Sequence, residues 1–452
     1  MAAPAPRPDG SGGHAGARRG RARDRPQPVG HQNGLDGLRF VASVAVLIYH
    51  VAGFTGDTLY DRPQAWLLAR GEVGVALFFV LSGLLLFRPW IKTLLLGAPR
   101  PAVPSYLWRR ALRILPAFWL VTVVSLFAFN AGKPKTQWDW AEVFLLLHIY
   151  DFHPWWPSTA VGPKALGQMW SLGVEASFYV LLPLLAVLLL WWARRRGSDV
   201  DRRARRLLLS LAVLTLVSFV YLYFTYYPTL RPTMQMWLPR YLCWFLGGMA
   251  ISTLTIWAQA ATPGGLRVRR FCHTVAHSPG TCLIAAAVAY AVAATPIAGP
   301  RGLGLATLSE MELKLFLYLA VAVLVVAPVA FQPQSQTVTN RIFGNPVMRF
   351  CGRVSYGVFL WQFVALYWFY DMTGYEFFSG GFFLVTIAGL AFTMVLASAT
   401  YYVIEKPSQS LRSVFDDPVR PAGPMDAVPQ DRALLAAQRK DVSPRPTTDP
   451  GR

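Results

Sequence analysis

The sequence predicts an all-α, polytopic membrane protein with about ten transmembrane helices and with both termini on the cytoplasmic side. The first reason is composition: of the 452 residues, 54% are hydrophobic and 15% are charged, whereas soluble domains carry roughly 25% charged residues. The second is that apolar runs long enough to cross a bilayer, roughly 17 to 25 residues each, recur along the chain. The third is that basic residues gather in alternate loops. These observations leave no soluble domain large enough to form its own core.

The apolar runs divide the chain into a membrane domain at 34–405 and two tails. Residues 1–33 are rich in Ala, Pro, Gly and Arg and predict a disordered basic tail, and the Pro- and charge-rich residues 406–452 predict a second disordered tail. No cleavable signal peptide is expected, so the first span acts as a signal anchor. The ten expected spans lie at 36–55, 72–90, 110–130, 171–193, 207–227, 238–259, 281–298, 313–331, 354–372 and 381–404.

The distribution of basic residues gives the expected orientation. Segments assigned to the cytoplasmic side hold 33 Lys and Arg residues, and segments assigned to the outer side hold 8. This is the bias that the positive-inside rule requires. The short loop RRRGSDVDRRARR at 194–206 is its strongest single indication, because it holds seven basic residues. The net charge of +20 therefore indicates orientation in the plasma membrane and not affinity for nucleic acid.

The four cysteines are scattered and imply no disulfide framework. The segment CHTVAHSPGTC at 272–282 gathers two Cys and two His, but its spacing fits none of the usual zinc patterns. We expect a short polar loop there and no metal site.

Two short stretches of the long outer loop leave alternatives open. EVFLLLHIY at 142–150 is too short to span the bilayer and predicts a re-entrant or interfacial helix. DFHPWWP at 151–157 carries aromatic rings that could stack on a sugar, although such rings are equally typical of the aromatic belt at a membrane interface.

Ionisable residues inside the spans are candidates for chemistry because polar groups are costly in hydrocarbon. In GLDGLRFVASVAVLIYH at 34–50, Arg39 precedes His50 by eleven residues, or about 16 Å along a helix. If Arg39 marks the cytoplasmic edge of a hydrocarbon core about 30 Å thick, His50 lies near mid-depth. The competing interpretation is a neutral histidine held in the core by one neighbouring hydroxyl or carbonyl.

A carboxylate enters from the other side of the membrane. In QMWSLGVEASFY, Glu175 lies five residues after Trp170, or about 7.5 Å further in. A buried carboxylate needs a basic or hydrogen-bonding partner. Because Glu175 and His50 approach mid-depth from opposite faces, a contact between them is geometrically feasible.

An arginine pair lies at the cytoplasmic mouth of the third span. In LWRRALRILPAFW, Arg110 and Arg113 share one helix face, and together with Arg39 they could clamp phosphate groups, because guanidinium forks bind oxyanions bidentately. Ordinary positive-inside anchoring explains the pair alone equally well. Ser82, in FFVLSGLLLF, has no adjacent base in the sequence and is not assigned as a nucleophile.

Taken in order, these motifs resemble the acyltransferase 3 family, the OafA-like integral membrane O-acyltransferases. The resemblance runs from about residue 34 to 407 and rests on GLDGLRF…YH, FFVLSG, the RxxR pair, WSLGVE and SYGVFLWQ. Two features depart from the family: Gln362 stands where the family often has a histidine, and from the short, Pro- and charge-rich tail we expect no SGNH-type hydrolase domain after the last span. A separate soluble protein would have to supply any second transfer step.

The resemblance implies about ten transmembrane helices and transfer of an acyl group, often acetyl, from cytoplasmic acyl-CoA to a hydroxyl of a carbohydrate, glycolipid, peptidoglycan or secondary metabolite. It implies His50 as the catalytic histidine, Arg39 as its arginine partner, Arg110 and Arg113 as donor-binding residues, and Glu175 as the acidic residue of the WSL motif. For the reaction itself we expect His50 to act as general base. Glu175 would then orient the imidazole or stabilise its protonated form, as the acid of a catalytic triad does.

Three alternatives stay open from the sequence. A covalent acyl-histidine could carry the group across the membrane. A secondary transporter or flippase would use the buried His, Glu and Arg as a proton relay or substrate site, although no internal repeat is evident. A membrane scaffold or sensor would need no catalysis.

Overall fold

Every regular element in the described part of the chain is a helix, which confirms the predicted all-α class. The computed structural model describes residues 33–157, 161–195, 199–300, 304–332 and 338–415. The expected tails at 1–32 and 416–452 lie outside these ranges. The helices are α2 Asn33–Phe54, α3 Pro63–Leu68, α4 Val73–Leu95, α5 Val103–Phe129, α6 Gln137–Phe144, α7 Trp170–Arg194, α8 Val200–Tyr226, α9 Leu238–Trp257, α10 Pro263–His277, α11 Pro279–Ala294, α12 Leu308–Ala330, α13 Val338–Phe343, α14 Pro346–Thr373, α15 Phe382–Thr400 and α16 Lys406–Ser408.

Seven helical segments within the described ranges are long and apolar enough to cross a bilayer, and α10 with α11, bent by 75°, would make an eighth. All ten predicted spans are helical, but α9 and α14 are not apolar enough to be counted among the segments that could cross a bilayer. Both pack inside the bundle, where their Trp, Tyr and Gln side chains are buried against protein instead of lipid. The number ten and the cytoplasmic position of the termini therefore stay predictions.

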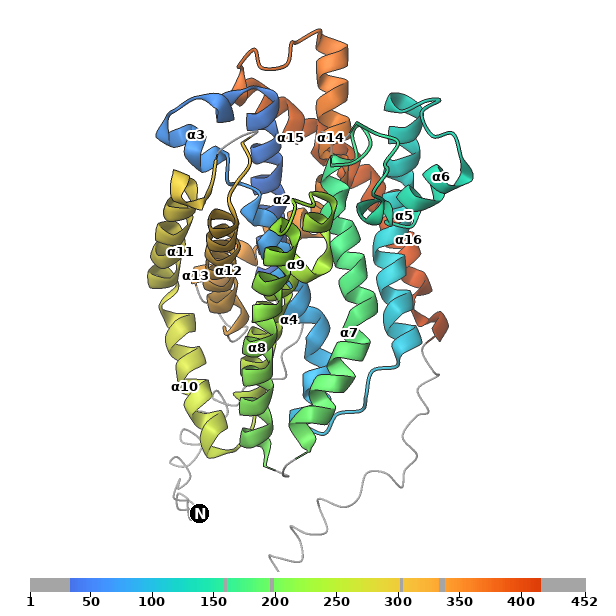
Figure 1. Ribbon diagram of the computed structural model, residues 1–452. Helices are drawn as coiled ribbons and strands as arrows, with labels where there is room; N and C mark the ends of the chain where they lie inside the picture. Colours follow the sequence, from blue (N-terminus) through green and yellow to red (C-terminus); the bar gives the residue numbers. More distant parts are fainter. Residues whose placement is uncertain (1–32, 158–160, 196–198, 301–303, 333–337, 416–452) are drawn as a thin grey trace, which may run out of the picture.

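The short outer helices and the basic loops lie at opposite ends of the bundle. In Figure 1, α3 and α6 lie at the upper end, whereas the end of α7 and the beginnings of α8 and α10 lie at the lower end. This separation agrees with the alternation of loops that the charge count predicts.

The outer surface of several long helices is apolar. On α7, the side chains of Val180, Leu184 and Leu188 are each more than half exposed, and their spacing of four residues places them on one helix face. Ile284 and Val288 of α11 are exposed in the same way. Soluble monomers rarely expose such contiguous apolar stripes, so these faces are the ones that contact lipid.

The centre of the bundle is a close contact between α4 and α9. Gly83 of α4 lies against the backbone of Phe245, and Gly248 of α9 lies against the backbone of Val80, with no space for a Cβ at either glycine. Small residues at a helix crossing let two backbones approach. This contact fixes α4, which carries Ser82 and several other residues of the site described below.

The long outer loop folds back onto the bundle. The stretch predicted as re-entrant or interfacial forms the end of α6 and a 3-10 turn at His148–Tyr150, and Leu146 and Ile149 are buried. The indole of Trp237 donates to the carbonyl of Ile149 at 2.9 Å. Further along, the Gln168 side chain donates to the carbonyl of Leu360 in α14 at 2.9 Å. The loop thus packs against the beginning of α7 and the middle of α14.

A buried carboxyl in this loop makes the stability of the outer end depend on pH. Glu142 is 1% exposed, and burial together with nearby Asp151 raises its pKa from 4.5 to about 7. A raised carboxyl pKa contributes stability that is complete below pH 4.5 and is lost as pH rises through about 7. Glu142→Gln should therefore stabilise the protein more at pH 8 than at pH 5, measured as the difference in melting temperature from wild type at each pH.

The matched control is Glu376→Gln, because Glu376 is an exposed residue of another outer loop. Its difference in melting temperature should be the same at both pH values. Burial also lowers the pKa of His148 to about 4, but that histidine is present in every variant and cancels in the comparison. Equal effects of Glu142→Gln at pH 5 and pH 8 would contradict the prediction.

The structure corrects the expected polar loop at 272–282. The segment is helical on both sides of the bend between α10 and α11, because Thr262 caps the N-terminus of α10 and Pro279 begins α11. His273 and His277 stack at 3.9 Å on one face of α10. Within the described ranges no three His, Cys, Asp or Glu side chains come together as a metal site would require.

The folded region also extends beyond the expected boundary at 405. A π-helical turn at Tyr401–Glu405 leads into α16 and a 3-10 segment at Gln409–Phe415. The indole of Trp108 in α5 donates to the carbonyl of Leu411 at 3.0 Å and ties this segment to the bundle.

Candidate active site

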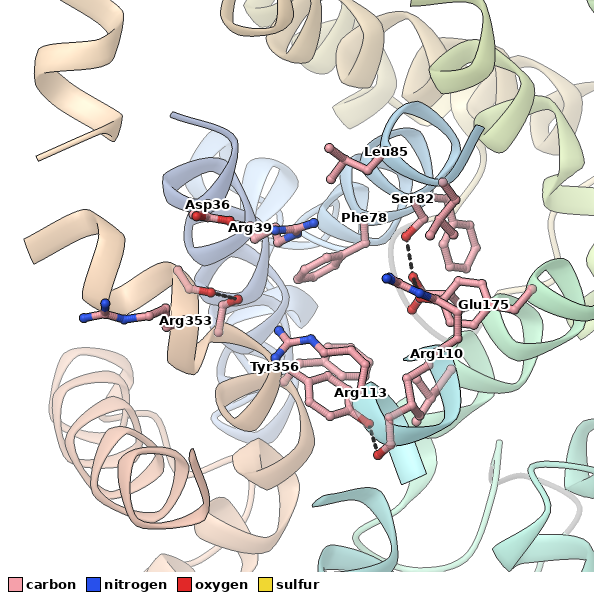
Figure 2. A pocket seen from close by; sticks show the side chains of 18 of the residues that line it. Asp36, Arg39, Phe78, Ser82, Leu85, Arg110, Arg113, Glu175, Arg353 and Tyr356 are labelled. Atoms are coloured by element: carbon pink, nitrogen blue, oxygen red, sulfur yellow. Dashed lines mark hydrogen bonds and ion pairs between the residues drawn. The ribbon is translucent and has the colours of Figure 1, made fainter. Parts of the chain in front are cut away.

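One cavity of about 440 Å³ collects most of the polar residues that the sequence singles out. Its walls come from α2, α4, α5, α7 and α14 and from the turns at 401 and 409–412. Four of the five predicted site residues, Arg39, Arg110, Arg113 and Glu175, line it. Figure 2 shows Arg39, Arg110 and Arg113 converging from two helices on the same opening. A volume of this size is typical of small-molecule sites.

Arg39 is held in place by a carboxylate of its own helix. Its Nη1 donates to Asp36 Oδ1 at 2.7 Å, one turn earlier in α2. Asp36 also lines the cavity. This ion pair orients the guanidinium and leaves the remaining donors of its planar fork for other partners.

The two arginines of α5 differ in their pairing. Arg113 Nη1 donates to Glu405 Oε2 at 2.8 Å, and Glu405 is 2% exposed. Arg110 has no ion pair within the described ranges, and its Nε is buried without a hydrogen-bond partner. Because leaving a buried donor unpaired costs about 1–3 kcal/mol, the Arg110 guanidinium is ready for an anionic ligand.

The opposite wall holds a carboxylate network. Ser82 of α4 donates to Glu175 Oε1, and the hydroxyl of Tyr179, one turn along α7, donates to the same oxygen at 2.7 Å. Ser82 has no adjacent base in the sequence, because α4 and α7 are far apart along the chain. The structure supplies a carboxylate for it.

His50 does not line this cavity. Its Nδ1 lies 3.0 Å from Gln362 Oε1, and its ring packs 4.3 Å from the Phe363 ring. Phe359, one turn before Gln362 and Phe363 in α14, does line the cavity. The histidine therefore lies one helical turn beyond the cavity wall.

The contact between His50 and Glu175 that the sequence made feasible is not formed. Each side chain takes a different partner: Gln362 for His50, and Ser82 with Tyr179 for Glu175. The physical reason is that Tyr179 lies on the same helix face as Glu175 and that α4 packs directly against α7. An orienting role of Glu175 toward His50 thus has no support in the geometry, and Gln362 takes that position.

Several residues of the cavity were not predicted from the sequence. They are the lining residues Asp36, Arg353, Gln409 and Arg412. Glu405, which pairs with the lining residue Arg113 from behind the cavity wall, was not predicted either. Arg412 belongs to the segment 406–452 that was expected to be disordered, so the sequence indicated a charged tail but no position for this side chain. Asp36 lies three residues before Arg39, and an i, i+3 ion pair on a helix could have been proposed for it.

Comparison with known proteins decides the family. The sequence profile of a family described as an acyltransferase domain matches residues 32–402, which include the five long helices of the cavity, α2, α4, α5, α7 and α14. The chain belongs to the acyltransferase 3 family. Gln409 and Arg412 are the two cavity residues that lie after the part matched by the acyltransferase 3 profile.

Individual relatives are more distant. The chain is 28% identical over 198 residues to O-acetyltransferase OatA of Staphylococcus aureus, which covers 41% of this chain and 30% of the relative. It is 26% identical over 211 residues to peptidoglycan O-acetyltransferase OatA of Listeria monocytogenes, which covers 44% of this chain and 30% of the relative. It is 28% identical over 178 residues to "Regulator of hypoxia-inducible factor 1" of Caenorhabditis elegans, covering 34% of each.

The aligned part is thus about a third of the length of these relatives. No solved structure matches the chain.

Proposed function

We propose that this protein is a multi-pass O-acyltransferase of the plasma membrane. It transfers an acyl group, acetyl being the expected one, from cytoplasmic acyl-CoA to a hydroxyl of a carbohydrate, glycolipid, peptidoglycan or secondary metabolite. The observation that carries the proposal is the concentration of five arginines around one cavity in a chain of the acyltransferase 3 family: Arg39, Arg110, Arg113, Arg353 and Arg412.

These arginines suit the phosphates of coenzyme A. Arg39 and Arg113 are each paired with one carboxylate, whereas Arg110, Arg353 and Arg412 form no ion pair with a carboxylate of the described part of the chain. A cavity with this excess of positive charge favours a polyanion, and guanidinium groups bind phosphate bidentately. Arg412 is exposed, and in this proposal it lies at the mouth, where the nucleotide end of the donor binds. Arg353 is exposed as well, and its side chain extends away from the other arginines in Figure 2.

The reaction needs a base near the thioester. In the proposed step the acceptor oxygen attacks the thioester carbonyl carbon, the carbon–sulfur bond breaks, and coenzyme A leaves as a thiolate. His50 takes the proton of the attacking hydroxyl and passes it to that thiolate. The donor's thioester arm has to extend past Phe359 to reach His50. Glu175, with Ser82 and Tyr179, forms a polar wall along that path.

The acceptor reaches His50 from the other side of the membrane in this proposal. A separate soluble protein is a candidate partner for acceptors that are not membrane-bound. The relatives from Staphylococcus and Listeria are named as O-acetyltransferases, the latter of peptidoglycan, and they support acetyl as the transferred group.

The donor site is tested with Arg110→Gln in proteoliposomes supplied with radiolabelled acetyl-CoA. We expect the KM for acetyl-CoA to rise about 10- to 100-fold, because a hydrogen bond to a charged group contributes about 1.5–3 kcal/mol. We expect kcat to change much less, because Arg110 contacts the donor away from the reacting carbon. The measurement is release of free coenzyme A with a panel of hydroxyl acceptors.

Arg267→Gln is the matched control, since it removes the same charge from an exposed position of α10 outside the cavity. An unchanged KM in Arg110→Gln would contradict the donor site. A wild-type protein that releases no coenzyme A with any acceptor, but moves protons or solutes without acetyl-CoA, would favour the transporter alternative.

A further inference from the structure

Gln362 makes two hydrogen bonds that together restrict how the imidazole of His50 can be protonated. Its side chain is fully buried in α14. Its Nε2 donates to the backbone carbonyl of Phe359 at 2.9 Å, and its Oε1 lies 3.0 Å from His50 Nδ1.

The orientation of the Gln362 amide follows from the first of these bonds. The Phe359 carbonyl is an acceptor only, so the amide group that faces it has to be the NH₂. The amide oxygen then faces His50. A carbonyl oxygen also has no proton to give, so the hydrogen bond forms only when His50 Nδ1 carries the proton and donates.

We propose that Gln362 is a positioning residue that fixes His50 in the Nδ1–H tautomer and thereby makes Nε2 the basic nitrogen. The catalytic part of this inference rests on the proposed acyl transfer. Nε2 has no hydrogen-bond partner among the described residues. Its lone pair is therefore available to accept the proton of a hydroxyl. The residue that orients the base is a neutral amide here, whereas in a catalytic triad it is a carboxylate.

The neighbourhood of His50 supports a neutral ring. Phe363 packs on the imidazole at 4.3 Å between ring centroids, and Tyr49 packs at 5.1 Å. The charged group that acts on His50 from a neighbouring element is Glu72, the residue that directly precedes α4. That carboxylate is already paired with Lys314 Nζ and with the hydroxyl of Tyr318, each at 3.1 Å.

The experiment compares Gln362→Met, Gln362→Glu and wild type in two measurements. The first is kcat and KM for acetyl-CoA across pH. We expect Gln362→Met to lower kcat about 10- to 100-fold with KM within twofold, because the ring loses its orientation while the donor site is untouched. We expect Gln362→Glu to keep most of kcat and to lose activity at a higher pH on the acid side, because a carboxylate favours imidazolium.

The second measurement does not depend on turnover. The ¹⁵N spectrum of histidine-labelled protein, with the His50 signal assigned by its loss in His50→Gln, should show the Nδ1–H tautomer in wild type and a mixture of tautomers in Gln362→Met. Gln168→Met is the matched control: Gln168 is also a buried glutamine that donates to a carbonyl of α14, but it does not touch His50. It should leave both the spectrum and the pH profile of wild type unchanged.

The outcomes separate the two proposals. An Nε2–H tautomer in wild type, a wild-type kcat in Gln362→Met, or an unshifted pH profile in Gln362→Glu would overturn the positioning role. The Nδ1–H tautomer in a protein that transfers no acyl group would support the tautomer assignment and overturn the proposed function.

Discussion

His50→Ala is expected to reduce acyl transfer from acetyl-CoA by about 100- to 10,000-fold, which is the usual contribution of a general base. The KM for acetyl-CoA should stay close to that of wild type, because His50 does not line the cavity that holds the arginines. The measurement is transfer of radiolabelled acetyl groups in proteoliposomes with the amount of folded protein matched between variants.

His277→Ala provides the control, because His277 is an exposed histidine of α10, and it should keep wild-type activity. His50→Gln retains much of the side-chain volume and should be as inactive as His50→Ala, which separates loss of the base from loss of packing. Transfer by His50→Ala at the wild-type rate would remove His50 from the mechanism and direct attention to Glu175 and Ser82 inside the cavity.

Gly248→Ala is expected to have the largest effect on folding. The added Cβ would overlap the backbone carbonyl of Val80 in α4, and backbone atoms cannot turn aside as a flexible side chain does. Overpacking of a closely packed core costs about 1–3 kcal/mol and sometimes more. We expect a lower yield of monodisperse protein in detergent and a lower melting temperature, and Gly83→Ala, on the facing helix, should behave in the same way.

Gly53→Ala tests whether the effect depends on position. Gly53 is a helical glycine of α2 with no atom within 4 Å of an added Cβ, and replacing glycine by alanine in a helix is favourable by roughly 0.5–1 kcal/mol. It should raise the melting temperature or leave it unchanged. If Gly248→Ala and Gly53→Ala behaved alike, the close contact between α4 and α9 would not be important for stability.

Much of the fold could be predicted because hydropathy and charge act locally along the chain. Each of the ten predicted spans contains a helix, and the basic loops lie at one end of the bundle. The failures have a physical cause. Residues 272–282 contain polar side chains and a proline, which resemble a loop in sequence, yet Thr262 caps one helix before them and Pro279 begins another within them.

The candidate site was predicted in part for the same reason. Arg39, Arg110, Arg113 and Glu175 belong to short motifs, and the structure places all four around one cavity. Their partners could not be predicted, because the paired residues are far apart in the sequence. Glu405 lies 292 residues after Arg113, and Gln362 lies 312 residues after His50. Such pairs depend on how α5 and α14 pack, and one sequence contains no information on which distant side chains meet.

The cavity joins the first described helix to the last described segment, and this has a consequence for the order of synthesis. Arg39 enters the membrane with the first span, whereas Glu405 and Arg412 follow α15, which contains the last predicted span. A chain still being made therefore has Arg113 without its carboxylate and a wall missing from the cavity. The cavity can be completed only after the last span has been inserted, so, if it is the donor site that we propose, a partly synthesised protein would consume no acyl-CoA.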